Sequence, residues 1–493
     1  MSKFGEKVKK MLRNWLQIQP PPAGQSITLH ELLSFETRVT QNRIWYRGDA
    51  HELSQFYKQI PDGCERFWRA APDHQKIRKI HSGLPAMMVD TLAYVVMADL
   101  DDISFGDGAE ADVTLERWSA LEKDADFRQQ VSNALVLALS LGDGAFKISV
   151  DPSVSKYPLL QFYPMDRVDF DTRWGRITGI TFYDDYPVKS KIYRLAESHT
   201  EGNVRYTLYD GDNPVELSTV PELTELKPAE FDGGHMMAVP LIIYQSQRYP
   251  GRGKSVYEGK LDSFDALDEV ISQWLDAVRA GRVKKYIPAD FIPRDPATLQ
   301  LKQPNDFGST YIDIDVPPSE SNNPNRRIDV VQPEIRYEAY LSTYTTALDM
   351  CLQGILSPAT LGIDIGKMSS AEAQREKKDI TGHTRNTITA VLEKVLPQLI
   401  ASMLMTYDTM QGNPPGHYEP IVSFGEYGAP DFGARVETVS KMAVSGTASI
   451  EAQVDELWGN SKDDSWKADE VRRIKQEKGI MEAEEPSAGD ELP

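Results

Sequence analysis

The segment Gly251-Arg-Gly-Lys-Ser255 comes closer to a phosphate-binding motif than any other part of the sequence. A Walker A loop reads G-x-x-x-x-G-K-[ST], and its glycine-rich backbone wraps the phosphates while its lysine neutralises them. If Gly253 is the second glycine of the motif, the first should stand at position 248, which is occupied by Arg248. We therefore interpret the segment as a flexible entry to a helix, and nucleotide hydrolysis through Gly251–Ser255 is kept as an alternative function.

No other group of residues has the spacing of a catalytic or metal-binding site. Gly106-Asp-Gly108 matches part of a dinucleotide fingerprint but follows no apolar strand. The aspartates at positions 99, 101, 102 and 107 lack the spacing of an EF-hand loop, and the eight histidines show no H-E-x-x-H pairing. The sequence also lacks a G-x-S-x-G nucleophile motif. It therefore predicts no catalytic residue, metal site or cofactor, and we expect a protein that is not an enzyme.

The chain of 493 residues has a formal net charge of −20 at pH 7. Proteins that grip DNA are usually basic, because phosphate neutralisation supplies their affinity, so this charge argues against tight DNA binding. Cys64 and Cys351 lie far apart, which argues against a disulfide framework or a cysteine metal site and fits an intracellular origin. No apolar run reaches the roughly 18–20 residues that span a bilayer, and no secretory signal is recognisable at the N-terminus.

Residues 1–17 form a candidate basic amphipathic helix, with apolar residues at helical spacing among lysines. Such a helix is typical of a membrane-surface anchor, so a membrane-associated scaffold is the second alternative function. We favour a helix that packs on its own protein or on a neighbouring subunit, and we expect no membrane partner.

The elements that follow change from helical to extended periodicity. Residues 28–150 predict helices at 28–40, 50–60, 84–99, 113–120 and 126–141, followed by a strand at 146–150. Residues 159–246 alternate in the strand manner, most clearly at 176–184, 189–197 and 203–209, with a hairpin turn at 199–203. The expected architecture is therefore α+β and mainly helical.

Two long helices flank a compact module in the middle of the chain. The first is predicted over 256–280, roughly 37 Å at ~1.5 Å per residue, with a capping box at Ser255 and Glu258 and a C-terminal cap at Gly281. Residues 282–332 are rich in proline and contain a short β-type segment at 309–316. The second helix is predicted from Pro333 to Gly354. This arrangement predicts a stalk that carries a small separate module.

The rest of the chain is predicted to be mostly helical. A loop at 355–368 leads into a helix of about 40 residues, opened by a capping box at Ser369 and Glu372 and kinked by Pro397. A short strand at 421–424 and helices at 431–445, 449–457 and 464–478 follow, and the acidic tail is expected to be disordered.

The start of the central module is basic within an acidic chain. Its basic residues are Arg279, Arg282, Lys284, Lys285, Arg294 and Lys302, against only Asp290 and Asp295. Such a patch could contact phosphate or an acidic partner protein, or could simply be solvated.

The order of these parts resembles the portal proteins of long-tailed bacteriophages. The stretches that carry the resemblance are Asn42-Arg-Ile-Trp-Tyr-Arg-Gly-Asp49, 251–287, 333–354, Ser357-Pro-Ala-Thr-Leu-Gly-Ile363, 369–385 and 430–458. The resemblance implies a portal fold with the following parts: N-terminal helices and wing at 1–253 (β region about 159–246), stem helix one at 254–281, clip at 282–332, stem helix two at 333–354, tunnel loop at 355–369, long kinked helix and wing strand at 370–425, crown helices at 426–480 and a disordered acidic tail at 481–493.

The same resemblance implies a function and a set of partners. The expected assembly is a ring, usually a dodecamer, that forms at one capsid vertex of the virion after synthesis in the host cytoplasm. It would pass double-stranded DNA without sequence specificity during packaging and ejection. It would contact the terminase large subunit, the head–tail adaptor, the major capsid protein and the scaffold. The family has no catalytic residues to transfer.

Two groups of residues become candidate sites under this resemblance. The tunnel loop would place Lys367, Asp364 and Ile365 toward the channel, and Lys367 is its only basic residue. Arg282, Lys284, Lys285, Arg294 and Lys302 of the clip would face partner proteins or the channel. Few phosphate contacts are expected, because each one strengthens binding to a polymer that has to slide.

Overall fold

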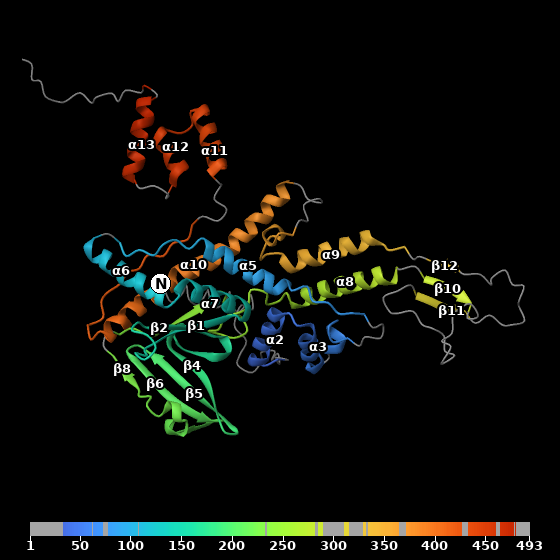
Figure 1. Cartoon of the computed structure of the whole chain (residues 1–493), viewed down its shortest axis with the longest axis horizontal. Helices are drawn as coiled ribbons and strands as arrows, with labels where there is room; N and C mark the ends of the chain where they lie inside the picture. The colour runs from blue at the N-terminus through green and yellow to red at the C-terminus, as the bar shows by residue number, and fades with distance from the viewer. Residues whose placement is uncertain are drawn as a thin grey trace, which may run out of the picture. The chain divides into compact units, whose positions relative to one another are not determined.

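The computed structural model describes residues 33–61, 63–71, 77–106, 108–231, 234–281, 284–288, 310–314, 329–331, 334–363, 371–425, 432–459, 464–477 and 479. It comprises two compact units, Met1–Phe424 and Gly425–Pro493, which are described separately. The predicted N-terminal helix at 1–17 and the acidic tail at 481–493 lie outside the described residues. Figure 1 gives the element labels.

The first unit begins with a helical layer. Its helices are α2 (Phe35–Arg47), α3 (Ala50–Gln59), α4 (Gly63–Arg66), α5 (Leu84–Ala98), α6 (Ala109–Asp124) and α7 (Phe127–Leu141). The helix predicted at 28–40 lies at 35–47 instead, because Ser34 accepts a hydrogen bond from the Thr37 N–H and caps its start. The helices predicted at 50–60, 84–99 and 126–141 are confirmed to within one residue at each end.

Two antiparallel sheets follow, as the period-two pattern predicts. The small sheet has the order β2-β1-β9, and the larger one runs β3-β4-β5-β6-β7 with β8 paired to β6. Their strands are β1 (Asp143–Ser149), β2 (Leu159–Pro164), β3 (Val168–Arg173), β4 (Arg176–Val188), β5 (Lys191–Thr200), β6 (Asn203–Asp210), β7 (Asn213–Val215), β8 (Ala229–Glu230) and β9 (Ala238–Ile242). The predicted β5–β6 hairpin is confirmed, with Gly202 at φ +69° in its turn.

Helix α10 (Ala371–Met410) supplies much of the core of this unit. Its segment Ile380–Met410 is long and apolar enough to cross a membrane by length and composition. Its largest apolar side chains, among them Leu392, Leu399 and Met403, are however buried against the rest of the unit. Since the apolar side is already covered by protein, we interpret α10 as a core helix. Pro397 lies inside the helix, and the kink expected there stays a prediction.

Helices α8 (Leu261–Ala280) and α9 (Tyr337–Leu352) form an antiparallel pair, which we call the stalk (Figure 1). The capping box predicted at Ser255 and Glu258 is wrong. The Ser255 hydroxyl is buried and donates to the Leu139 carbonyl, and Gly259 adopts φ +84°, a conformation that cannot continue a helix. Helix α8 therefore starts at Leu261, and its 20 residues span about 30 Å. The expected cap at Gly281 is confirmed, because its N–H bonds the Ala277 carbonyl.

A three-stranded sheet connects the two stalk helices. Its strands are β10 (Lys284–Pro288), β11 (Thr310–Ile314) and β12 (Asp329–Val331), in the order β11-β10-β12. Strand β10 is parallel to β11 and antiparallel to β12. Because β10 follows α8 and β12 precedes α9 at short intervals, the sheet belongs to the far end of the stalk (Figure 1).

The first half of the predicted loop at 355–368 is packed rather than free. Pro358–Leu361 forms a 3-10 helix, and Ile355, Leu356, Ser357 and Pro358 are buried. The Thr384 hydroxyl donates to the Ile355 carbonyl at 2.6 Å, and the Ser357 N–H donates to the Thr381 hydroxyl at 2.9 Å. These bonds fasten the segment to α10. Residues 364–370, with the predicted cap at Ser369, lie outside the described residues.

The second unit contains three helices. They are α11 (Phe432–Ser445), α12 (Ile450–Trp458) and α13 (Asp464–Glu477), close to the three predicted ones. Ser449 caps α12 by accepting from the Ala452 N–H. The ion pair between Lys475 and Glu451, at 2.8 Å, ties α13 to α12.

Candidate functional site

The two stalk helices are held together by aromatic contacts toward their far end and by a hydrogen bond near their base. The rings of Trp274 on α8 and Tyr340 on α9 are stacked, 6.2 Å apart between centroids with 8° between their planes. Tyr344 lies against the same indole. Near the base, the Lys260 ammonium donates to the Met350 carbonyl at 2.9 Å. The helices therefore run side by side along their length.

The outer halves of the two stalk helices are only partly covered by the described part of the chain. Of the α8 residues beyond Ser272, and of the α9 residues before Ala347, none is buried. Several large apolar side chains stay exposed there or near the base: Val278 at 47%, Tyr337 at 62%, Leu341 at 40% and Met350 at 54%. Most of the stability of a helix in a protein comes from the packing of its apolar face. These exposed apolar side chains are candidates for burial against other chains.

The polar residues of the stalk offer little to a phosphate. Helix α8 carries five acidic residues, of which Asp265 and Asp268 are buried, and a single arginine, while α9 carries two acidic residues and no basic one. The hydroxyls of Thr343, Thr345 and Thr346 donate to the carbonyls four residues earlier in α9. A hydroxyl that already donates to its own helix has no proton left for a phosphate oxygen. The polar side chains of the stalk surface are thus mostly acidic, or are hydroxyls that already donate to their own helix.

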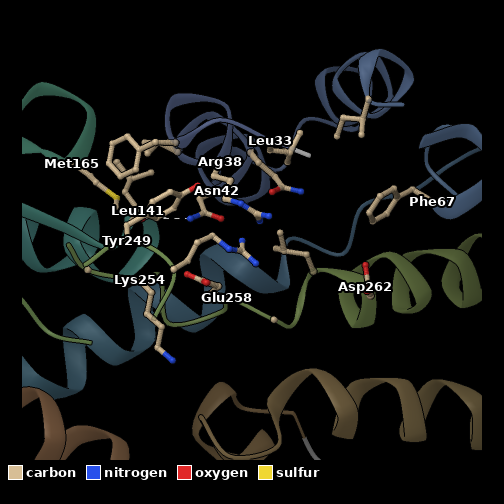
Figure 2. Close-up of a pocket in the computed structure, with 18 of the residues that line it drawn as sticks. Leu33, Arg38, Asn42, Phe67, Leu141, Met165, Tyr249, Lys254, Glu258 and Asp262 are labelled. Carbon is tan, nitrogen blue, oxygen red and sulfur yellow. Dashed lines mark hydrogen bonds between the residues drawn. The ribbon is translucent and has the colours of Figure 1, made fainter. Parts of the chain in front are cut away.

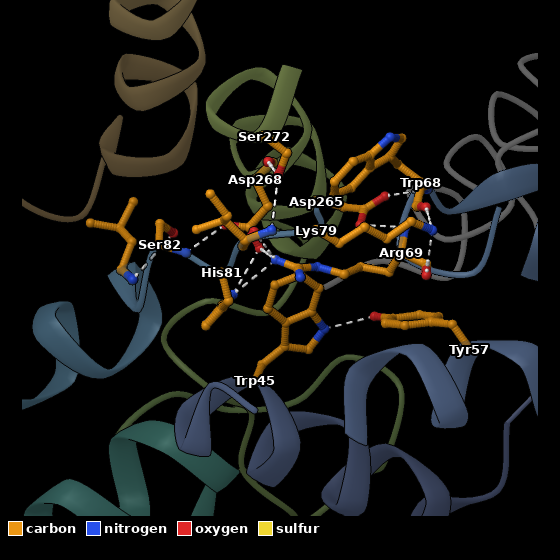
Figure 3. Close-up of polar contacts among 12 residues, drawn as sticks. Trp45, Tyr57, Trp68, Arg69, Lys79, His81, Ser82, Asp265, Asp268 and Ser272 are labelled. Carbon is orange, nitrogen blue, oxygen red and sulfur yellow. Dashed lines mark hydrogen bonds and ion pairs between the residues drawn. The ribbon is translucent and has the colours of Figure 1, made fainter. Parts of the chain in front are cut away.

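A buried ionic network fastens the base of the stalk to the helical layer (Figure 3). The Asp268 carboxylate of α8 forms an ion pair with the Arg69 guanidinium, and both side chains are completely buried. The same carboxylate lies 2.7 Å from His81 Nδ1 and accepts the Ser82 N–H at 2.7 Å. Arg69 also donates to the Ile80 carbonyl at 2.7 Å. Asp268 therefore joins α8 both to the segment that contains Arg69 and to the segment that contains His81 and Ser82.

Asp265, one turn earlier on α8, extends this network. Its carboxylate accepts the N–H groups of Trp68, at 2.7 Å, and of Arg69, at 3.3 Å. Burial raises its pKa to about 6, against the opposing effect of those two hydrogen bonds and of the Arg69 charge. Ser272, one turn after Asp268, accepts the Ile80 N–H at 2.9 Å. The first three turns of α8 are thus fixed by polar contacts on one side (Figure 3).

The raised pKa of Asp265 predicts a pH-dependent stability. The folded protein holds this proton more tightly than the unfolded chain, whose carboxyl titrates near 3.8. The contribution of Asp265 to the free energy of unfolding should therefore fall as the pH rises from about 4 to about 6, and stay constant above that. Asp265→Asn cannot titrate, so the stability difference between wild type and variant should change by roughly 2–3 kcal/mol over this window. Urea unfolding at pH 4.5, 5.5 and 7 measures it, and a constant difference would contradict the assignment.

Gly253 and Lys254 of the segment Gly251–Ser255 line a cavity of about 280 Å³ together with residues of α2 and the start of α8. Its charged lining residues are Arg38, Arg66, Arg248, Lys254, Glu258 and Asp262. Figure 2 shows the Lys254 side chain extending away from Arg38 and Asn42. The cavity therefore does not present this lysine to a ligand at its centre.

The backbone of the same segment is unsuited to bind a phosphate. A P-loop offers free N–H groups, but here they are already taken: Arg252 N–H by the Tyr249 carbonyl, Gly253 N–H by the Asp143 carboxylate at 2.6 Å, and Lys254 N–H by the Tyr244 carbonyl. A carboxylate in contact with the loop also repels phosphate. The nucleotide hydrolase alternative has no support in this arrangement.

The acidic residues considered in the sequence as a possible cation site do not form one in the described part of the chain. Of the four aspartates considered as a cation site, Asp99 pairs with Arg385, Asp102 pairs with Arg128 at the surface, and Asp101 accepts a hydrogen bond from the Ser423 hydroxyl, while Asp107 lies outside the described residues. Within the part of the chain that the structure describes, no three His, Cys, Asp or Glu side chains are grouped as metal ligands.

The candidate DNA-facing and clip residues are largely beyond the described part of the chain. Lys284 and Lys285 lie in β10, opposite Val331 and Val330 of β12. Arg282, Arg294 and Lys302 of the clip and Asp364, Ile365 and Lys367 of the tunnel loop lie outside the described residues. Their roles stay predictions.

The network at the base of the stalk was not anticipated from the sequence. Asp265, Asp268 and Ser272 recur at i, i+3 and i+7, the spacing of one helix face, and that face also carries Phe264 and Leu267. Three polar residues among apolar ones at this spacing indicate buried polar contacts. Their partners, Arg69 and His81, lie almost 200 residues away, and no local pattern points to them.

Comparisons with known proteins give weak similarities. No family model and no curated protein matches the chain. A chain of the structure "Neck of native GTA particle computed with C12 symmetry" is 12% identical, with 76% of this chain and 89% of that chain covered and a TM-score of 0.38. For "Virion of native gene transfer agent (GTA) particle" the identity is 12%, the coverage 91% and 96%, and the TM-score 0.38. For "Neck of empty GTA particle computed with C6 symmetry" the identity is 13%, the coverage is 77% of this chain and 90% of that chain, and the TM-score is 0.39. Similarities at this level carry no argument, so the function is argued from the geometry.

Proposed function

We propose that this chain is the portal subunit of a tailed-phage-type particle, one member of a ring through which double-stranded DNA passes. The observation that carries the proposal is the stalk. Its two helices leave the body of the first unit, have no buried residue after Ser272 of α8 or before Ala347 of α9, and keep Val278 and Leu341 exposed. Copies of the same stalk, packed side by side around an axis, would bury these side chains and enclose a channel.

The charge of the stalk supports passage of DNA rather than retention by tight binding. Each phosphate contact by a basic residue releases counterions and strengthens binding. Acidic side chains and threonine hydroxyls that donate to their own helix make no such contact. A channel faced by this surface would let a duplex slide.

The remaining parts take their roles from the order of elements along the chain. The sheet of β10, β11 and β12 corresponds to the clip, and its basic residues would meet the terminase large subunit or the head–tail adaptor. Lys367, with Asp364 and Ile365, would form the tunnel loop and supply a sparse basic ring to the DNA. The major capsid protein and the scaffold would contact the outer surface of the ring at the capsid vertex.

The salt dependence of DNA binding distinguishes a channel through which DNA slides from a protein that binds DNA tightly. We expect the purified chain to bind linear duplex DNA weakly. The slope of log K against log salt concentration should then correspond to only about one or two phosphate contacts per subunit. Lys367→Ala should flatten that slope further. Filter binding or fluorescence anisotropy between about 50 and 200 mM salt measures it. Tight binding with a steep slope per subunit would contradict a sliding conduit.

A further inference from the structure

The tip of the β3–β4 hairpin combines three locally unfavourable features. Trp174 lies in the turn with φ +53° and is fully exposed, at 103%. Arg173 and Arg176 stand directly opposite each other in the last rung of the hairpin, and both are exposed. Among the described residues, neither arginine forms an ion pair. We call Arg173, Trp174, Gly175 and Arg176 the docking tip.

Each of these features costs stability in the isolated subunit. A positive φ is disfavoured for a bulky residue, and glycine or asparagine would suit the turn better. Like charges directly opposite on neighbouring strands repel each other. The exposed indole contributes no hydrophobic stabilisation to the single subunit, because its surface stays in contact with water. Several locally destabilising features at one point of the surface are typical of a binding site. Trp and Arg are also among the residues most enriched at the energetically dominant centres of interfaces.

The same chain carries a surface of complementary character on α6. The first half of that helix exposes two large apolar side chains, Val113 at 50% and Leu115 at 40%. The carboxylates beside them are exposed too: Glu110, Asp112 and Glu116. In the described part of the chain none of these three carboxylates has an ion-pair partner. Because Glu116 is a surface neighbour of both Asp112, four residues earlier, and Val113, three residues earlier, these side chains form a single patch, which we call the α6 face.

We propose that the docking tip of one copy binds the α6 face of the neighbouring copy. Trp174 would cover Val113, and Arg173 and Arg176 would pair with Asp112 and Glu116. Both surfaces are exposed on one chain, so they are free to meet between copies. A contact between two different surfaces of identical subunits is heterologous, and a heterologous contact generates a ring when the rotation between neighbouring subunits closes. The inference rests on the proposed ring and names a contact that would close it.

Charge exchange tests the pairing directly. The tip variant Arg173→Glu/Arg176→Glu and the face variant Asp112→Arg/Glu116→Arg each place like charges across the contact. Each alone should reduce the ring fraction of the full-length chain at least tenfold, by mass photometry at low salt, since like charges across an interface cost several kcal/mol. The chain with all four substitutions restores opposite charges and should form rings again. An equimolar mixture of the two double variants should also assemble, because every tip then meets a face of opposite charge.

Strain at Trp174 gives a second, independent test with a matched control. Trp174→Gly removes the indole but relieves the positive φ, so the melting temperature should stay equal or rise by about 1–2 °C while ring formation falls at least tenfold. Lys189, at φ +57° in the next turn of the same sheet, is exposed as well. Lys189→Gly should have the same effect on melting and none on assembly.

The outcomes separate the inference from the proposed function. Ring formation by the wild type, loss in both double variants and recovery in the fourfold variant would support the contact. Rings that form normally with Trp174→Gly or with either double variant would overturn the contact and leave the portal proposal standing. Loss without recovery in the fourfold variant and in the mixture would overturn the pairing with α6. A wild type that forms no ring would overturn both proposals.

Discussion

Asp268→Ala should lower the free energy of unfolding of the first unit by about 3–5 kcal/mol, the cost of removing one partner from a buried ion pair. The Arg69 guanidinium, completely buried, would lose its carboxylate, and the Ser82 N–H would lose its acceptor. Urea unfolding followed by fluorescence measures the loss. Hydrogen exchange should become faster at 77–83 and in the first three turns of α8, since these are the segments that Asp268 joins.

A matched acidic residue on the same helix controls for this effect. Asp276 is not buried and forms no ion pair within the described residues. Asp276→Ala should therefore change the stability by less than about 0.5 kcal/mol. Replacing both partners with apolar residues, as in Arg69→Met/Asp268→Leu, should recover most of the loss, because no charge is left buried without a partner. If Asp268→Ala were as mild as Asp276→Ala, the network would not fasten the stalk.

Val278→Asp/Leu341→Asp should strongly weaken assembly without unfolding the subunit. Both side chains are exposed on the stalk of the single chain, so the monomer should keep its stability within about 0.5 kcal/mol. Between packed stalks, each new carboxylate would be buried without a partner, at a cost of several kcal/mol per interface. We expect the concentration needed for assembly to rise at least about 100-fold, as analytical ultracentrifugation would show.

An exposed valine elsewhere provides the control for this variant. Val154 is 69% exposed and lies in a turn between β1 and β2. Val154→Asp should assemble like the wild type. Rings that form equally well with the stalk variant would place the subunit contacts away from the stalk.

Local patterns in the sequence were sufficient to predict most of the fold. The apolar periodicity of α5 and α7 and the alternation of β4, β5 and β6 place these elements within a few residues of their observed ends. The stalk with its small sheet was predicted in outline from two amphipathic helices around a proline-rich stretch. These features depend on neighbours in the chain, which a sequence pattern records.

Features set by contacts distant in sequence could not be predicted. The Ser255-x-x-Glu258 pattern has the spacing of a helix cap, but Ser255 bonds Leu139 instead and α8 starts later. Pro358 and Gly362 predict a loop at 355–363, yet hydrogen bonds to Thr381 and Thr384 fix this segment to α10. The ionic network of Asp268 joins segments that only the folded structure brings together. The sequence therefore predicted the two stalk helices, but not the residues that fasten them to the rest of the unit.

Electron microscopy of the purified full-length chain tests most directly whether it forms a DNA conduit. We predict class averages of a ring with one central hole wide enough for a duplex, with the stalks gathered around that hole. Val278→Asp/Leu341→Asp should remove these particles under the same conditions. Only single subunits, at every protein and salt concentration and after prolonged incubation, would contradict the account.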